Sequence, residues 1–431
     1  MRIERLGDLG SAPAVLRAIA AGAQRHELPP PAALIGEWFG SAAVIAPSLL
    51  AVAVDDVFAV PTGESDGAIG GGWFGFLSYP DGGVDGLGPR IPEAAGGWSD
   101  CVLRQDRDGQ WWYESLSDAP LSSWVSEALR SPVPPRAYEI TWGDADRTAH
   151  RHGVLECLEA IAAGEVYQAC VCTQFAGRLE GEPVDFFADA VERTSPARAA
   201  YLAGEWGAVA SLSPELFLSR RGEVVTSSPI KGTLPRNADP AALRASVKDV
   251  AENIMIVDLV RNDLGRVAIT GSVTVPELLE VRPAPGVWHL VSTVSARVDR
   301  EVPMAAVLDA TFPPASVTGT PKTRARQLLR GWEPRRRGVY CGTVGLASPV
   351  AGCELNVAIR TVEFDAKGNA VLGVGGGITA DSDPDREWDE CLDKAAPFVD
   401  AALQRRIPAH SRSQLPEATL SRSPSSSSPR N

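Results

Sequence analysis

Two ionisable side chains with complementary chemistry lie sixteen residues apart, Glu215 in S-P-E and Lys231 in P-I-K-G-T. A carboxyl group can donate or accept a proton, and an amine can act as a nucleophile once it is neutral. Lys231 stands between Ile230 and Gly232. It is therefore either a paired structural charge or an amine prepared for covalent chemistry, and its surroundings leave both interpretations open.

Two further pairs of carboxylates have helical spacing. Asp249 and Glu252 are three residues apart in one predicted helix, and Glu387 and Glu390 in another, with Lys394 one turn later. Side chains at positions i and i+3 share a helix face. Oxygen ligands of this kind suit Mg²⁺, which takes a few carboxylates and keeps several waters. Solvated acidic faces are the ordinary alternative, because exposed charges are the norm on surface helices.

A glycine-rich segment, L-G-V-G-G-G-I-T-A at 372–380, leads into the second of these helices. Its backbone NH groups could cradle a carboxylate or a phosphate. The segment matches neither the dinucleotide fingerprint nor the P-loop. Two lone candidates lie on predicted strands: His289 is a catalyst or a satisfied core residue, and Arg360 binds a carboxylate or forms an ion pair.

The surrounding pattern has to position these groups. Two β-compatible runs joined by a turn at Gly222 predict a hairpin that carries Glu215 and Lys231. Other elements are expected at 148–163 (helix), 166–175 (strand with Gln168), 239–265 (helix), 354–364 (strand) and 385–403 (helix).

Composition narrows the class of protein. The 431 residues are 44% hydrophobic and 22% charged, as in an ordinary soluble protein, and the net charge of −13 argues against nucleic acid as a partner. No apolar run is long enough for a membrane helix, and charges interrupt the N-terminus where a signal peptide would stand. Seven scattered cysteines without C-x-x-C spacing indicate reduced thiols, so the cytoplasm is the expected compartment.

The joint order of the motifs is similar to that of one family along most of the chain. The chorismate-utilising enzymes include the large subunit of anthranilate synthase, component I of aminodeoxychorismate synthase, and the isochorismate and salicylate synthases. The chain resembles them in G-E-V-Y-Q-A (164–169), S-P-E (213–215), P-I-K-G-T (229–233), A-E-N-I-M-I-V-D-L-V-R-N-D-L-G-R (251–266), V-W-H-L (287–290), T-G-T-P-K (318–322), G-V-G-G-G-I-T-A-D-S-D-P (373–384) and E-W-D-E-C-L-D-K (387–394).

The resemblance implies an α+β fold in which two large, mostly antiparallel β-sheets pack as a sandwich, with helices outside and the active site in a cleft. Residues 1–135 would form the N-terminal part of the sandwich, with room for an effector-binding region. Residues 140–405 would form the chorismate-binding catalytic region. The Ser-rich tail, 406–431, is too polar to bury a core and is expected to be disordered.

The resemblance also implies roles for the candidate residues. Lys231 would be the nucleophile and Glu215 the general acid, with His289 as a third catalytic candidate. Glu252 and Glu390 would hold Mg²⁺, with Asp249 and Glu387 bonding its waters. The expected substrate-binding residues are Gln168, Gly232, Thr233, Thr318, Tyr340, Arg360, Gly375, Gly376, Gly377 and Lys394.

Two positions discriminate within the family. Gln168 stands where water-using members carry a water-activating lysine, which favours ammonia as the nucleophile. Lys231 stands where anthranilate synthases carry alanine, which favours amination of chorismate to 4-amino-4-deoxychorismate. The alternatives are anthranilate plus pyruvate, an isochorismate-type reaction, and a catalytically silent chorismate-binding subunit. The sequence shows no glutaminase motif, so ammonia is expected from a separate class I glutamine amidotransferase subunit.

Overall fold

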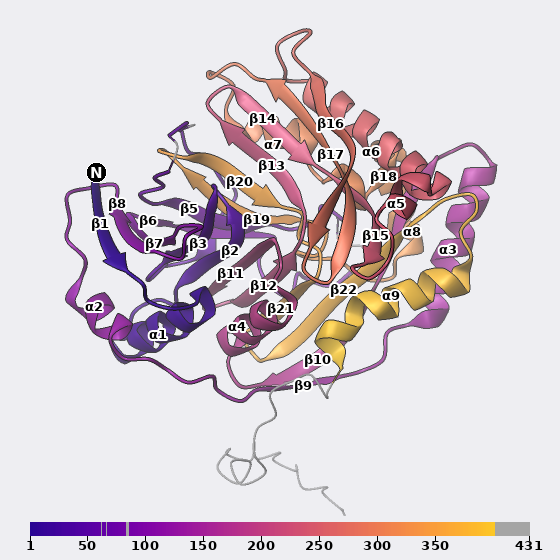
Figure 1. Cartoon of the computed structure of the whole chain (residues 1–431). Coiled ribbons are helices and arrows are strands. Elements are labelled where there is room, and N and C mark those ends of the chain that lie inside the picture. Colours follow the sequence, from indigo (N-terminus) through magenta and orange to yellow (C-terminus); the bar gives the residue numbers. More distant parts are fainter. Residues whose placement is uncertain (62, 66, 83–85, 401–431) are drawn as a thin grey trace, which may run out of the picture.

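Two large β-sheets form the framework of the molecule, with helices packed against them (Figure 1). The computed structural model describes residues 1–61, 63–65, 67–82 and 86–400. Paired strands run antiparallel in both sheets. The predicted α+β class is therefore confirmed, whereas the tail from residue 406 and the end of the last predicted helix lie outside the described residues.

The first sheet, sheet A, joins strands from both ends of the chain. Its strands are, in spatial order, β1 (Arg2–Gly7), β8 (Trp111–Ser115), β7 (Cys101–Gln105), β3 (Ser41–Ala46), β2 (Ala32–Trp38), β11 (Arg198–Gly204), β12 (Gly207–Ser213), β21 (Thr361–Asp365), β22 (Asn369–Ile378), β10 (Gln168–Glu180) and β18 (Gly319–Thr320), with β9 (Glu139–Trp142) also paired to β10.

Sheet B is built mostly from strands between residues 216 and 356. Its strands are, in spatial order, β15 (Ile230–Pro235), β17 (Val287–Arg297), β14 (Val224–Ser228), β13 (Leu216–Arg221), β20 (Gly352–Asn356), β19 (Thr343–Ser348), β5 (Gly72–Leu77), β6 (Ala94–Ser99) and β4 (Val52–Ala53), with β16 (Thr274–Ala284) also paired to β17.

A hydrophobic layer lies between the sheets. Leu34 and Val44 of sheet A belong to one buried cluster with Phe74 and Leu346 of sheet B. Burial of such side chains is the main favourable contribution to folding, at roughly 25 cal/mol per Å² of apolar surface. The predicted sandwich is therefore confirmed.

Helices cover the remaining apolar faces of the sheets. One cluster joins α1, α2, α4 and the end of α9 to sheet A; a second joins α3 and α8 to β10; a third contains α6 and α7 with strands of sheet B. Among the described residues no helix is long and apolar enough to cross a membrane. The helices are α1 (Ala12–Arg25), α2 (Ser123–Leu129), α3 (Arg147–Ala162), α4 (Pro183–Thr194), α5 (Ala241–Ala245), α6 (Val247–Gly265), α7 (Met304–Thr311), η1 (Ala315–Val317, 3₁₀), α8 (Lys322–Trp332) and α9 (Pro384–Val399).

The first 135 residues contribute strands to both sheets. In sheet A, β2 pairs with β11, and in sheet B, β5 pairs with β19. Both sheets therefore continue across the proline-rich segment before residue 140. That this segment divides an effector region from a catalytic region stays a prediction.

The single helix predicted over 239–265 is wrong, because the chain forms α5 and α6 with a break at Ser246. Ser246 has an extended backbone, with φ −72° and ψ 110°. Its hydroxyl accepts a hydrogen bond from the Asp249 backbone NH at 3.2 Å. Serine is a favoured residue at the N-cap of a helix. Helix α6 therefore begins at Val247, with Asp249 and Glu252 in its first turns.

The predicted hairpin forms from β13 and β14, and Gly222 in its turn has φ +55°. Lys231, however, does not lie on the second strand of that hairpin. It lies on the next strand, β15, which pairs with β17. The strand predicted over 354–364 also divides, into β20 of sheet B and β21 of sheet A, and Arg360 stands at the crossover with φ +51°.

Candidate active site

The candidate residues converge at Gly377, near the end of β22. A Cβ atom at Gly377 would lie 3.2 Å from Lys231 Nζ, 3.3 Å from Gln168 Oε1 and 3.6 Å from Glu252 Oε2. These three side chains come from β15, β10 and α6. An amine, an amide and a carboxylate thus face one stretch of bare backbone, where only glycine leaves the space between them open.

Strand pairing brings these residues together. The β10 and β22 strands pair with Cys170 opposite Gly377, so Gln168 at the start of β10 lies beside the end of the glycine segment. The Gln168 side chain is 2% exposed, and neither its oxygen nor its nitrogen has a hydrogen-bond partner. Because an unpaired buried amide is costly, this arrangement is typical of a group reserved for a ligand.

A second set of charged groups surrounds Gly376. A Cβ atom there would lie 2.8 Å from Glu387 Oε2 and 3.9 Å from Glu390 Oε1. The Ser382 hydroxyl donates to Glu387 Oε1 at 2.7 Å. Lys394 pairs with Glu390 at 2.7 Å and donates to the Gly375 carbonyl at 2.7 Å, which holds α9 against β22.

The backbone of Gly375 is less open than that of its neighbours. A Cβ atom at Gly375 would lie 2.6 Å from Cys172 Sγ on the paired strand. Asp249 lies against Gly232, whose added Cβ would be 3.0 Å from the aspartate Cβ. The Gly232 backbone has φ +88°, a conformation that favours glycine and lets β15 turn beside Lys231.

The acidic groups fit a divalent cation in their donor chemistry. Glu252 Oε1 and Glu387 Oε2 are both buried without a hydrogen-bond partner. Burial raises the pKa of Glu252, against the opposing charges of Lys231 and Lys248. Burial would also raise the pKa of Glu390, but Lys394, Lys248 and Lys231 together outweigh it and hold that pKa below its usual value. Within the described ranges, no three His, Cys, Asp or Glu side chains are gathered closely enough to hold a metal ion.

Glu215 is suited to donate a proton. It follows β12 in the chain and is 3% exposed. Burial raises its pKa to about 7, although the Lys231 ammonium opposes that shift. A carboxyl group with such a pKa carries its proton in a large share of molecules at neutral pH, as a general acid must.

His289 and Arg360 form a second polar group near β15. His289 Nδ1 lies 2.9 Å from the Thr233 hydroxyl. Burial, and then the Arg360 charge, lower the pKa of His289 to about 4, so its ring is neutral at physiological pH. Burial lowers the pKa of Arg360 as well. Its guanidinium pairs with no carboxylate in the described part of the chain, which leaves it free to receive an anionic group.

Thr318 and Tyr340 are not among the side chains that lie closest to Gly377. Thr318 is fully buried and its hydroxyl donates to the Pro314 carbonyl at 2.9 Å. The Tyr340 ring lies on Gly373, four residues before Gly377. There it lines a separate cavity of about 80 Å³ with His150 and Gln174. A direct substrate contact for either side chain stays a prediction.

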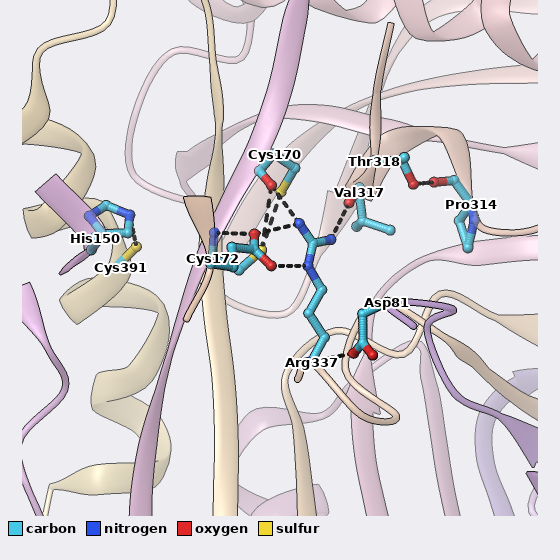
Figure 2. Close-up of polar contacts among 10 residues, drawn as sticks. Asp81, His150, Cys170, Cys172, Pro314, Val317, Thr318, Arg337 and Cys391 are labelled. Carbon is cyan, nitrogen blue, oxygen red and sulfur yellow. Dashed lines mark hydrogen bonds and ion pairs between the residues drawn. The ribbon is translucent and has the colours of Figure 1, made fainter. Parts of the chain in front are cut away.

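Sequence reasoning missed a buried ion pair behind the site, which Figure 2 shows. The Arg337 guanidinium donates to the Cys170 and Val317 carbonyls at 2.7 Å, and it pairs with Glu333. Glu333 in turn accepts from the Cys172 backbone NH at 3.0 Å. The pair thereby supplies the hydrogen bonds that a neighbouring strand would make with Cys170 and Cys172 of β10. Through the Val317 carbonyl it also connects β10 to η1. The run R-R-R at 335–337 was the only sequence signal.

We expect Arg337→Met to destabilise the fold by about 3–5 kcal/mol, because it leaves a buried glutamate and two buried carbonyls without their donor. Urea unfolding would measure this free energy. Arg335, two residues earlier, is exposed, so Arg335→Met should change stability by less than about 0.5 kcal/mol. Equal stability of the two variants would contradict a structural role for Arg337.

We expect Gly377→Ala to weaken catalysis by about 10- to 100-fold in kcat/KM, since its methyl group would stand among Lys231, Gln168 and Glu252. The protein should still fold, because Gly377 has no positive φ. Gly331→Ala is a matched control on α8, where an added Cβ meets no atom within 4 Å. Unchanged kinetics for Gly377→Ala would show that substrate does not approach this backbone.

Comparison with known proteins assigns the chain to one family. The family model described as chorismate binding enzyme matches residues 51–400. Aminodeoxychorismate synthase component 1 of Escherichia coli K12 is 37% identical over 281 residues, which cover 63% of this chain and 62% of that protein. Aminodeoxychorismate synthase of Streptomyces pristinaespiralis is 36% identical over 370 residues, 77% of this chain and 51% of that protein. The chain thus spans 51–62% of the length of these two curated relatives.

A solved structure shares the fold. The crystal structure of anthranilate synthase component I from Streptococcus pneumoniae aligns with a TM-score of 0.68 over 92% of each chain, at 24% sequence identity. The two sheets, the order of the motifs and the match over residues 51–400 agree, and the chain belongs to the chorismate binding enzyme family.

Proposed function

We propose that the chain aminates chorismate with ammonia to give 4-amino-4-deoxychorismate, the precursor of para-aminobenzoate. The observation that carries this proposal is the placement of Lys231 Nζ and Gln168 Oε1 beside Gly377, 3.2 and 3.3 Å from where its Cβ would lie. An amine nucleophile is available there, and no basic residue stands at position 168 to activate water. The names of the curated relatives from Escherichia coli and Streptomyces pristinaespiralis support the same reaction.

Lys231 and Glu215 would divide the first step between them. The neutral Lys231 amine attacks C2 of chorismate, the C1=C2 and C5=C6 double bonds of the ring shift to C1=C6 and C4=C5, and the C4–O bond breaks. Glu215 gives its proton to the departing hydroxyl group, which leaves as water. Ammonia then attacks C4, both ring double bonds shift back and the Lys231 amine is expelled. The new ammonium group returns one proton to the Glu215 carboxylate, so that chorismate and ammonia yield product and water.

The remaining residues would bind and orient the substrate. Arg360 and Lys394 supply positive charge for its carboxylates, and His289 with Thr233 borders the pocket as a neutral pair. Glu252 and Glu390 would hold Mg²⁺, with Asp249 and Glu387 beside them; the cation would neutralise the ring carboxylate when bound. The buried oxygens of Glu252 and Glu387 that lack a hydrogen-bond partner support this assignment.

Ammonia would come from a separate glutamine amidotransferase subunit; the name of the Escherichia coli relative, aminodeoxychorismate synthase component 1, supports a partner subunit. We place the reaction in the cytoplasm, which the free thiols at all seven cysteines favour.

The test is a product assay on the purified chain with chorismate, Mg²⁺ and an ammonium salt. We expect a product with the mass and ultraviolet spectrum of aminodeoxychorismate and no pyruvate. Stoichiometric pyruvate with anthranilate would assign the chain to the alternative reaction, and isochorismate would assign it to the water-using one. Substantial turnover with glutamine alone would contradict the need for a separate glutaminase subunit.

A further inference from the structure

One lysine near the site has no role in the proposed reaction. Lys248, in the first turn of α6, places its Nζ 3.6 Å from Glu387 Oε1 on α9 and 3.9 Å from Glu252 Oε1 on its own helix. These two carboxylates are among the proposed metal-site residues, and their side chains are only 4% and 12% exposed. A single ammonium group therefore faces two nearly buried carboxylates from different helices.

We propose that Lys248 is a built-in counter-cation that occupies the metal site in the metal-free protein and competes with the divalent cation for it. This inference rests on the metal site of the proposed function. Without a cation, Glu252, Glu387 and Glu390 would repel one another across the gap between α6 and α9. Lys248 offsets that repulsion, and its ammonium has to move away before an ion with twice its charge can bind between the same carboxylates.

Compared with Lys231 and Lys394, Lys248 is the lysine whose side chain can move away from these carboxylates into solvent. Its side chain is 49% exposed, compared with 13% for Lys231, which pairs with Glu252 Oε2 at 3.9 Å. Lys394 is tied down by Glu390 and by the Gly375 carbonyl. Both contacts of Lys248 are ion pairs longer than a hydrogen bond, so its flexible stem can swing into solvent at little cost.

Calorimetric titration of Mg²⁺ into the metal-free full chain, without chorismate, tests the competition. We expect Lys248→Met to bind Mg²⁺ about three- to tenfold more tightly than the parent chain, since two ion pairs of roughly 0.2–1 kcal/mol each no longer oppose binding. Lys248→Arg keeps the charge and should stay within about twofold of the parent. Lys367→Met, which removes an exposed lysine in the turn between β21 and β22, is the matched control and should not change the affinity.

Thermal unfolding gives a second measurement. In a chelator, Lys248→Met should melt below the parent chain, and saturating Mg²⁺ should raise its Tm by more than it raises that of the parent. Should Lys248→Met fail to fold, Lys248→Gln replaces it in both experiments.

An unchanged or weaker Mg²⁺ affinity in Lys248→Met would contradict the proposed role of Lys248 without contradicting the proposed metal site. Absence of Mg²⁺ binding to every variant and to the parent would overturn both this inference and the metal assignment. The two failures are therefore distinguishable.

Discussion

Replacing Lys231 by alanine should lower the rate of 4-amino-4-deoxychorismate formation from chorismate and ammonia by about 10²–10⁴-fold, the range expected when a catalytic side chain acting in the transition state is lost. The substitution removes the proposed nucleophile from its place 3.9 Å from Glu252 and leaves the glycine backbone intact. Direct amination of C4 would then have to proceed without the covalent step. Initial rates with Mg²⁺ and ammonium salt, analysed by product mass, would measure the loss.

The proposed chemistry and a purely structural charge at Lys231 predict different outcomes. A structural charge would lower stability and leave kcat close to that of the parent chain in the folded fraction, whereas a nucleophile would lower kcat in a chain with normal Tm. Lys367→Ala removes an exposed lysine and should leave both unchanged. Full retention of activity in Lys231→Ala would refute the nucleophile assignment, and a gain of anthranilate would place the chain close to the alanine-bearing enzymes.

Local sequence pattern was enough to predict many elements but not their partners. The helix predicted over 148–163 corresponds to α3 (Arg147–Ala162), and the hairpin turn at Gly222 forms as predicted. Both depend on contacts between near neighbours. The strand that carries Lys231 pairs instead with β17, about sixty residues later, and the segment 354–364 crosses between sheets. Alternation of apolar and polar residues predicts that a segment is extended, but it does not predict which sheet the strand joins.

The site shows the same division between local and long-range information. The order of the motifs predicted that Lys231, Gln168 and Glu252 act together, and the structure gathers these three at Gly377. The contact of Lys248 with Glu387 could not be predicted, because a lysine at an exposed helical position resembles any solvated charge. Arg337 was missed for a related reason: its partners include backbone carbonyls of β10 and η1, and backbone acceptors leave no residue-type signal.

Replacing Glu215 by glutamine should lower kcat by about 10²–10⁴-fold, because an amide cannot protonate the departing C4 hydroxyl. Burial raises the pKa of Glu215 to about 7, so kcat/KM of the parent chain should fall as pH rises through about 7 and the acid is lost. In Glu215→Gln that alkaline limb should disappear from the residual activity. The pH dependence of kcat/KM between about 5 and 9 measures both effects.

The same substitution should raise the free energy of unfolding at pH 8, although it lowers activity. In the unfolded chain Glu215 has its ordinary pKa of 4.5, so between pH 4.5 and about 7 the folded protein holds a proton that the unfolded protein releases. The stability that this group contributes is present below pH 4.5 and is lost by pH 8, a change of about 3 kcal/mol. Glu215→Gln avoids that loss. It should therefore unfold at higher urea than the parent chain at pH 8, even though it is nearly inactive.

An exposed glutamate provides the control for Glu215. Glu205→Gln, in the turn between β11 and β12, should change neither the pH profile nor the stability. If Glu215→Gln kept the alkaline limb, the acid that protonates the leaving group would be another residue. If Glu215→Gln lost activity without gaining stability at pH 8, the folded protein would not destabilise the charged form of Glu215. The pKa of Glu215 would then not be raised, and its assignment as the general acid would be wrong. Only the combination of lost activity and gained stability identifies a carboxyl group that the fold keeps protonated for the reaction.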